Sequence, residues 1–225
     1  MTPAPSLLYT PGIDVSRHNG AINWKMVRQA GVRFASIRLS VGDYYTDPNF
    51  DQNWQGARDQ GLHLTAYHVV APADGNGRLI PGREQAEYFL SALGDRKPDL
   101  PLVLDCELDR GCDPQTITRG ILECSQVLRD AGGFAYPMIY TRKTWWNPHV
   151  KPHPDWRKHP LWVAHYTSAR TPWLPRDWID FQCWQHTNQG DAALYGAQGK
   201  YIDLNRWAGS LPGDPGQPPA SLHLE

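Results

Sequence analysis

The sequence lacks long hydrophobic runs and an excess of charge of either sign. No apolar stretch approaches the roughly 20 residues that a membrane-spanning helix needs. The 22 Lys and Arg residues face 23 Asp and Glu residues, which gives a formal net charge of -1. Neither a basic nucleic-acid-binding surface nor an acidic disordered chain is therefore expected. The start, residues 1–6, has no basic and no apolar segment, so we expect no signal peptide in this chain.

Cysteine is scarce, with four in 225 residues. Cys106, Cys112, Cys124 and Cys183 form no C-x-x-C pair and no zinc-ligand spacing, so a structural zinc site is not expected. Four cysteines allow three disulfide pairings, but free, mostly buried thiols are favoured because the chain is long enough to build its own core.

Aromatic residues, glycine and proline are plentiful, with 10 Trp, 10 Tyr, 20 Gly and 20 Pro. This composition is typical of a loop-rich fold with an aromatic core or groove, and sugar rings favour aromatic grooves. G-x-S-x-G, phosphate-loop and dinucleotide motifs are absent, so serine-nucleophile chemistry and nucleotide binding have no support.

The first half of the chain alternates apolar runs with helical patterns. Strands are predicted at 7–15, 32–39, 62–70 and 100–105, and helices at 24–30, 47–61, 83–93 and 113–130. The starts Asp47-Pro48 and Asp113-Pro114 each combine an N-cap with a proline at the first helical position. Such β-α units predict parallel strands joined by right-handed crossovers.

The second half keeps the strands but loses the helical periodicity. Strands are predicted at 135–140, 161–165, 181–186 and 201–204, separated by segments rich in Pro and Trp. The α/β pattern predicts an irregular, TIM-like (β/α) barrel with several outer helices missing in the second half. Residues 7–209 are expected to form this catalytic domain, after an N-terminal extension at 1–6 and before a Pro/Gly-rich tail or linker at 210–225.

Acidic residues follow the predicted strands. Active sites of parallel β/α barrels lie at the carboxyl ends of the strands. Asp14 ends the first strand, Asp105 and Glu107 end the fourth, and Asp203 lies in the last. Because Asp105 and Glu107 are two positions apart, both face the same side of an extended strand. Such a pair suits glycoside hydrolysis, in which one carboxyl group donates a proton to the leaving oxygen and the other stabilises positive charge at the anomeric carbon.

The spacing of this pair is weak support by itself. Random placement of 23 acidic residues in 225 positions gives about two acid-x-acid pairs, as many as the chain contains. The position of the pair directly after the buried run 102–104 is more informative, because buried charges need a role.

Alternative functions explain these residues less well. An interaction module would leave the carboxylates unexplained. A chitinase-like barrel needs a D-x-x-D-x-D-x-E run and a metal-dependent deacetylase needs clustered histidines, and neither pattern is present.

Histidine and aromatic residues also lie near strand ends. His18, His68, His165 and His186 form no H-x-H or H-E-x-x-H pair, so we interpret them as hydrogen-bonded rim residues and expect no metal or other cofactor. We expect about half of the aromatic residues near strand ends to pack in the core and the others to stack on sugar rings. These residues are Tyr67, Tyr140, Trp145, Trp146, Trp162, Tyr166 and Trp184.

A series of short motifs occurs in order between residues 12 and 207: Gly12–Ser16, Ile22–Trp24, Ala30–Phe34, Tyr45–Phe50, Ala66–His68, Pro101–Glu107, Ile139–Thr141, Leu161–Ala164, Trp184–Gln185 and Ile202–Arg206. As an ordered set they resemble glycoside hydrolase family 25. That resemblance implies an irregular β/α barrel and a lysozyme (N-acetylmuramidase) that hydrolyses the β-1,4 bond between N-acetylmuramic acid and N-acetylglucosamine in bacterial peptidoglycan.

The resemblance also implies roles for individual residues. Glu107 would be the general acid, and Asp105 would act as a nucleophile or orient the substrate's own acetamido group. Asp14 and Asp203 would complete the acidic cluster and raise the proton affinity of Glu107. The residues expected to bind substrate are Tyr67, His68, Tyr140, Tyr166 and Trp184.

The partner that the resemblance implies is cell-wall peptidoglycan, with no role for nucleic acid or membrane. A monomer acting outside the cell or at the cell wall is expected, as a phage endolysin or a secreted bacterial enzyme. The alternative is a catalytically inactive, peptidoglycan-binding member of the same fold, and the retained Asp105 and Glu107 argue against it. Residues 37–43 and 17–19 depart from the family's usual motifs, which bears on subsite preference rather than on the reaction.

Overall fold

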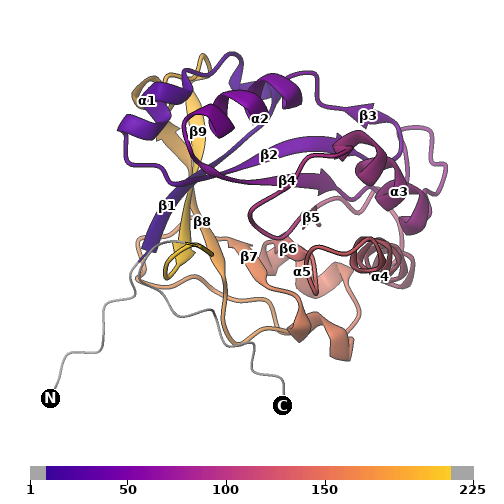
Figure 1. The fold of residues 1–225 in the computed structure, drawn as a ribbon. Coiled ribbons are helices and arrows are strands. Elements are labelled where there is room, and N and C mark those ends of the chain that lie inside the picture. Colours follow the sequence, from indigo (N-terminus) through magenta and orange to yellow (C-terminus); the bar gives the residue numbers. More distant parts are fainter. Residues whose placement is uncertain (1–8, 214–225) are drawn as a thin grey trace, which may run out of the picture.

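The structure is a computed structural model that describes residues 9–213 (Figure 1). The predicted extension at 1–6 and residues 214–225 of the predicted tail lie outside the described residues. The strands are β1 (Tyr9–Val15), β2 (Phe34–Val41), β3 (Tyr45–Thr46), β4 (His63–Val69), β5 (Val103–Asp105), β6 (Met138–Thr141), β7 (Leu161–Ala164), β8 (Cys183–Asp191) and β9 (Tyr201–Ala208). The α-helices are α1 (Trp24–Gln29), α2 (Phe50–Asp59), α3 (Gly82–Leu93), α4 (Pro114–Asp130) and α5 (Lys143–His149), and short 3₁₀ turns cover Arg17–Asn19, Pro154–Lys158 and Ala192–Tyr195.

Eight of these strands close into a barrel. They pair in the order β1-β9-β8-β7-β6-β5-β4-β2, and β2 pairs again with β1 to complete the ring. The two-residue strand β3, which was not predicted, is added to β2 in antiparallel register. The predicted α/β barrel is therefore confirmed.

The last strand runs against the predicted direction. The sequence pattern predicted parallel strands, but β9 is antiparallel to both of its neighbours, β1 and β8. The segment between β8 and β9 holds a single 3₁₀ turn. A connection this short returns the chain alongside the strand that it has just left, whereas a parallel strand requires a longer crossover.

Helices cover mainly the first half of the barrel, as predicted. Helix α2 packs on β2 and β4, and α1 contacts the 3₁₀ turn Ala192–Tyr195. Helix α3 contacts β2 and packs against α4, which contacts β5 (Figure 1). The second half has the seven-residue α5, which the prediction missed, and no helix is assigned between β7 and β8 in the described residues. Helix α5 contains Pro148 and buries Trp145 and Trp146, so its sequence shows little helical periodicity.

Helix starts follow local capping chemistry. The Asp113 side chain accepts hydrogen bonds from the backbone N–H groups of Gln115 and Thr116, and Pro114 opens α4 as predicted. The predicted cap at Asp47 is wrong by two residues, because the N-cap of α2 is Asn49. Asp47 instead accepts a hydrogen bond from Arg38 Nε at 2.8 Å, so its carboxylate joins α2 to strand β2.

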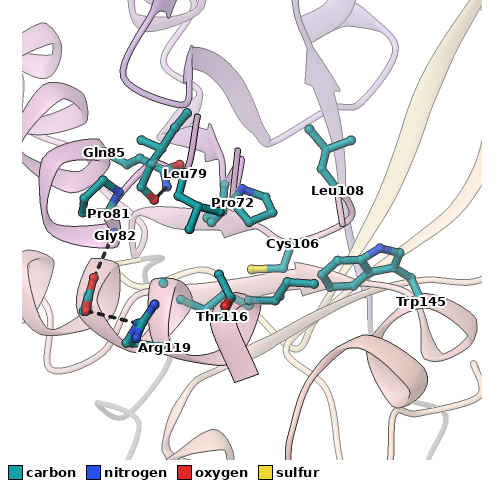
Figure 2. A pocket seen from close by; sticks show the side chains of 16 residues that line it. Pro72, Leu79, Pro81, Gly82, Gln85, Cys106, Leu108, Thr116, Arg119 and Trp145 are labelled. Atoms are coloured by element: carbon teal, nitrogen blue, oxygen red, sulfur yellow. Dashed lines mark hydrogen bonds and ion pairs between the residues drawn. The ribbon is translucent and has the colours of Figure 1, made fainter. Parts of the chain in front are cut away.

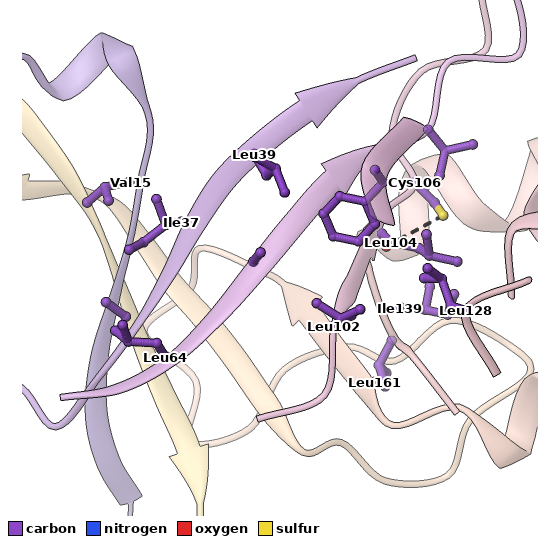
Figure 3. Packing of buried hydrophobic residues seen from close by; sticks show 14 of the residues in the cluster. Val15, Ile37, Leu39, Leu64, Leu102, Leu104, Cys106, Leu128, Ile139 and Leu161 are labelled. Atoms are coloured by element: carbon purple, nitrogen blue, oxygen red, sulfur yellow. Dashed lines mark hydrogen bonds between the residues drawn. The ribbon is translucent and has the colours of Figure 1, made fainter. Parts of the chain in front are cut away.

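Two hydrophobic clusters stabilise the barrel. The larger one lies between the strands and the outer helices and loops, and Figure 3 shows part of it around Leu64, Leu104 and Ile139. The smaller one fills the barrel interior with Phe34, Val103, Met138, Trp162, Cys183 and Trp207. Leu211, which lies in the predicted tail, joins the interior cluster and is 1% exposed, so this part of the tail packs on the barrel.

All four cysteines are free, which confirms the preference for thiols over disulfides. Three of them are buried, and Cys112 is half-buried. Within residues 9–213, no helix has the length and apolar composition needed to cross a membrane.

Candidate active site

A polar pocket with a volume of about 210 Å³ lies at the carboxyl ends of the barrel strands. It brings together all four predicted carboxylates and three of the five residues predicted to bind substrate. Its lining residues are Asp14, Tyr67, Asp105, Glu107, Tyr140, Trp162, Tyr166, Gln185, Asn188 and Asp203. A larger pocket of about 290 Å³ borders α3 and α4 (Figure 2) and contains none of these carboxylates.

Asp14 and Asp203 face each other across the β1–β9 pairing. Burial raises the pKa of Asp14 to about 6, although hydrogen bonds from Asn205 and Gln185 partly offset this effect. Burial, followed by the negative charge of Asp14, raises the pKa of Asp203 to about 8. At neutral pH Asp203 therefore keeps its proton and donates a hydrogen bond to Asp14.

An amide network orients Asp14. Gln185 Nε2 donates to both Asp14 oxygens at 3.0 and 3.1 Å, and Asn205 Nδ2 donates to Oδ1 at 2.6 Å. The Gln185 Oε1 atom accepts hydrogen bonds from the hydroxyls of Tyr140 and Tyr166 at 2.9 and 2.7 Å. Trp162 Nε1 donates to Asn205 Oδ1 at 2.8 Å. Because each amide oxygen has a donor, both NH₂ groups point at the carboxylate.

Asp105 and Glu107 form the second carboxylate pair. Asp105 is the last residue of β5, and Glu107 lies in the loop that follows. Asp105 is 6% exposed, and its Oδ1 atom has no hydrogen-bond partner among the described residues. Burial, followed by the charges of Glu107 and Asp14, raises the pKa of Asp105 well above its usual value.

Glu107 also binds its proton more tightly than an isolated carboxyl group does. Burial raises its pKa, and the positive charge of Arg142 opposes this change. The resemblance attributed the raised proton affinity to Asp14 and Asp203, but desolvation is the main cause at Glu107. This pocket therefore holds a carboxylic acid that can remain protonated above the usual range of glutamate.

Three predicted substrate-binding tyrosines line the pocket. Tyr67 and Tyr140 stand on β4 and β6, and burial raises both phenol pKa values well above normal, so both remain neutral. Tyr166 follows β7 and is 50% exposed at the pocket mouth. A polar wall of this kind can contact the hydroxyl groups and ring faces of a sugar.

His68 and Trp184 lie elsewhere, and their positions do not support the predicted contacts with substrate. Both are 0% exposed. The His68 ring hydrogen bonds to Ser40 Oγ at 2.9 Å and packs beside Phe89 of α3, and burial lowers its pKa to about 4. Trp184 Nε1 donates to the backbone oxygen of His165 at 2.8 Å. Both side chains therefore belong to the layer outside the strands.

The predictions overlooked Gln185, Asn205 and Asn188 as site residues. A signal for two of them was available, because neighbouring strand residues point to opposite faces. Asn205 is two positions after Asp203 and shares its face, while Gln185 is adjacent to Trp184 and takes the opposite face. No comparable pattern identifies Asn188.

The chain matches one protein family over most of its length. Residues 13–193 match the family model described as Glycosyl hydrolases family 25. The chain belongs to this family. Family 25 membership makes the protein a glycoside hydrolase of the lysozyme type.

Relatives within family 25 cover most of the chain. Lysozyme M1 of Streptomyces globisporus is 32% identical over 211 residues, which are 88% of this chain and 68% of the relative. N,O-diacetylmuramidase of Chalaropsis sp is 27% identical over 205 residues, 85% of this chain and 93% of the relative. The crystal structure of the bacterial lysozyme from Streptomyces coelicolor has a TM-score of 0.78 at 31% identity and covers 89% of this chain and 93% of its own.

Proposed function

We propose that this family 25 protein is a lysozyme that cleaves the β-1,4 bond between N-acetylmuramic acid and N-acetylglucosamine in bacterial peptidoglycan. The observation that carries the proposal is the pairing of Asp105 and Glu107 in one pocket, where burial raises the pKa of Glu107. The names of the relatives, lysozyme and N,O-diacetylmuramidase, support the same bond and substrate. The proposed partner is the cell wall, which places the activity outside the cytoplasm.

Glu107 is the general acid in this proposal. Desolvation raises the pKa of its carboxyl group, which favours the protonated form. The proton passes to the glycosidic oxygen as the bond from that oxygen to the anomeric carbon breaks, and the bonding electrons leave with the oxygen. The resulting Glu107 carboxylate can then accept a proton from the water that attacks the anomeric carbon.

Asp105 supplies negative charge beneath the developing oxocarbenium ion. It acts either by bonding to the anomeric carbon or by orienting the substrate's acetamido oxygen toward that carbon, and both routes need the ionised form. Asp105 lies in the buried part of the pocket, whereas Glu107 is less buried. This difference favours Glu107 as the group that reaches the leaving oxygen.

Asp14 acts as a positioning residue in this proposal. Its charge faces the Asp105 and Glu107 pair, and the amides of Gln185 and Asn205 hold its carboxylate in place. The same network fixes the hydroxyls of Tyr140 and Tyr166 at the pocket wall. A preorganised wall of this kind limits the reorganisation that the transition state requires.

The decisive variant is Glu107→Gln, which keeps the side-chain shape but cannot donate the proton. We expect wall hydrolysis to fall by about 10²- to 10⁴-fold, the usual contribution of a general acid. Mass analysis of soluble fragments from purified cell walls measures the rate and identifies the new reducing end. The control is Glu87→Gln, which changes an exposed carboxylate on α3.

Because Glu107 must be protonated, wild-type activity should also decline on the alkaline side of its optimum.

Three outcomes would contradict the proposal. A folded Glu107→Gln variant that digests peptidoglycan at the wild-type rate would show that the acid is another residue. A wild-type protein that binds purified walls but releases no fragments would favour the inactive, peptidoglycan-binding alternative. Fragments that end in N-acetylglucosamine would indicate cleavage of the other glycosidic bond.

A further inference from the structure

A second pocket adjoins the acidic pocket and carries the opposite charge. It has a volume of about 210 Å³ and is formed by residues that follow β6 and β7. Its lining includes Arg142, Lys143, Thr144, His165, Tyr166 and Trp173, and we call it the cationic pocket. Tyr166 also lines the acidic pocket, so a single extended ligand can occupy both.

The two cations of this pocket are available to a ligand. Arg142 and Lys143 are exposed, and neither side chain forms an ion pair or hydrogen bond within residues 9–213. By contrast, Arg38, Arg58 and Arg78 are each paired with an aspartate. Unpaired cations beside a concave surface attract anions, and carboxylates match their hydrogen-bonding geometry.

The positive field reaches the acidic pocket. The charge of Arg142 opposes the rise in the pKa of both Asp105 and Glu107. Lys143 acts on the other side, where burial followed by its charge lowers the pKa of His165. The boundary at Tyr166 therefore separates four carboxylates from two cations.

An exposed aromatic ring forms the outer wall. Trp173 is 65% exposed and stacks on His165 with ring centroids 4.8 Å apart and an interplanar angle of 25°. The backbone N–H of Trp173 donates to His165 Nδ1 at 3.1 Å, so this imidazole nitrogen is an acceptor. The indole is thus supported from one side, and its large exposed surface is suited to packing against an apolar group of a ligand.

We infer that the cationic pocket binds the acidic branch of a muramic acid residue, and this inference rests on the proposed function. N-acetylmuramic acid differs from N-acetylglucosamine by a lactyl ether, which carries a carboxylate when free and a peptide with its own carboxylates when substituted. Arg142 and Lys143 pair with either group. The apolar part of the branch packs on Trp173. A neutral chitin chain gains nothing from these cations, so the pocket selects muramic-acid-containing glycans.

Three tetrasaccharides test this inference. One alternates N-acetylglucosamine with N-acetylmuramic acid bearing free lactyl carboxylates, the second carries stem peptides on the same glycan, and the third is neutral chitotetraose. Their dissociation constants are measured by calorimetry in a Glu107→Gln background, where turnover does not interfere. Lys143→Gln is the cleaner variant, because Arg142 also acts on the proposed acid.

We expect Lys143→Gln and Arg142→Gln each to weaken binding of a carboxylate-bearing glycan by about threefold to tenfold, with less salt dependence than the parent. Binding of chitotetraose should change by less than about twofold. The controls Lys25→Gln and Arg33→Gln remove exposed cations that line neither the acidic pocket nor the cationic pocket. Weakening with the free-lactyl glycan identifies the lactyl carboxylate as the bound group, and weakening with the peptide-bearing glycan alone identifies the peptide.

The inference is overturned if neither variant weakens binding of either acidic glycan, or if chitotetraose loses affinity to the same extent. Its failure differs from failure of the proposed function. Wild-type protein that hydrolyses none of the glycans, while carboxylate binding still depends on Lys143, would reject the proposed reaction but keep the subsite. Hydrolysis of muramic-acid glycans by wild-type protein, with no effect of Lys143→Gln or Arg142→Gln on binding, would keep the proposed reaction and reject the subsite.

Discussion

The proton on Asp203 links the geometry of the site to the stability of the protein. Its pKa is about 8 in the fold, compared with 3.8 for the isolated group, because burial and Asp14 disfavour its charge. A carboxyl group with a raised folded-state pKa favours the folded state most strongly at pH values below its unfolded pKa. That contribution declines as the pH rises from about 4 and is lost as the pH passes about 8.

Asp203→Asn should therefore flatten the loss of stability at alkaline pH. The amide can still donate a hydrogen bond to Asp14, but it does not ionise. We expect the melting temperature of the variant to rise relative to that of the wild type between pH 5 and pH 9, and scanning calorimetry across this range measures it. Asp180→Asn, at an exposed aspartate, is the control. Parallel pH curves for wild type and Asp203→Asn would refute this account.

At the scale of single residues, the four carboxylates were selected because acidic side chains at the end of a buried strand are unusual. They line one pocket in the structure. His68 and Trp184 were predicted to contact substrate because of their residue types. The alternation of side chains between the two faces of a strand was not taken into account. Tyr67 and His68 are adjacent on β4, so only one of them can face the barrel interior.

Helices α3 and α4 meet at two glycines, of which Gly82 has no room for a side chain and Gly120 has room for one. A Cβ atom on Gly82 would lie 2.0 Å from the backbone oxygen of Gly120, whereas a Cβ atom on Gly120 would meet nothing within 4 Å. Figure 2 shows Gly82 at the edge of the pocket beside α4. The backbone N–H of Gly82 also donates to Glu123 Oε2 at 3.0 Å, which fixes the start of α3 on α4.

Gly82→Ala should destabilise the protein by about 1–3 kcal/mol, because the helices must separate to admit the methyl group. Gly120→Ala is the matched comparison and should be neutral or stabilising by up to about 1 kcal/mol, since alanine favours the helix interior. Urea unfolding measures both changes. Equal destabilisation by the two substitutions would show that the close approach of the helices is not the cause.

Elements with a local signal were predicted more accurately than those that depend on the closed barrel. Helix α4 begins at Pro114 as expected, because Asp113 and Pro114 encode the cap directly. The direction of β9 was missed, since it depends on the short connection from β8 and on pairing with β1. Helix α5 was missed because Pro148 and the adjacent Trp145 and Trp146 obscure its periodicity.

At the scale of the whole molecule, Leu211 contributes to the interior of the barrel. It is 1% exposed and packs in the barrel-interior cluster, although the sequence placed it in a Pro/Gly-rich tail. A chain that ends at residue 209 loses this contact, whereas a chain that ends at residue 213 keeps it. We expect the shorter chain to melt about 4–10 °C below the longer one. Equal melting temperatures would show that Leu211 contributes nothing, and Leu211→Ala in the longer chain separates the side chain from the backbone.

The architecture as a whole was predictable because β-α alternation leaves few topologies for the first half of the chain. The missing outer helices were also visible, as segments without periodicity. The strand pairing that closes the barrel was not predictable, because pairing between β1 and β9 joins residues far apart in the chain and leaves no local pattern. The same long-range pairing brings Gln185 and Asn205 within hydrogen-bond distance of Asp14.

The pairing of β1 with β9 also determines when activity can first exist during synthesis. Asp14 leaves the ribosome before Asn205, its hydrogen-bond donor 191 positions later in the chain. Until β9 emerges, β1 and β8 lack a shared neighbour and the Asp14 carboxylate lacks the Asn205 donor. A nascent chain without β9 therefore lacks part of the acidic pocket, and the proposed wall-degrading activity requires synthesis of the complete barrel sequence.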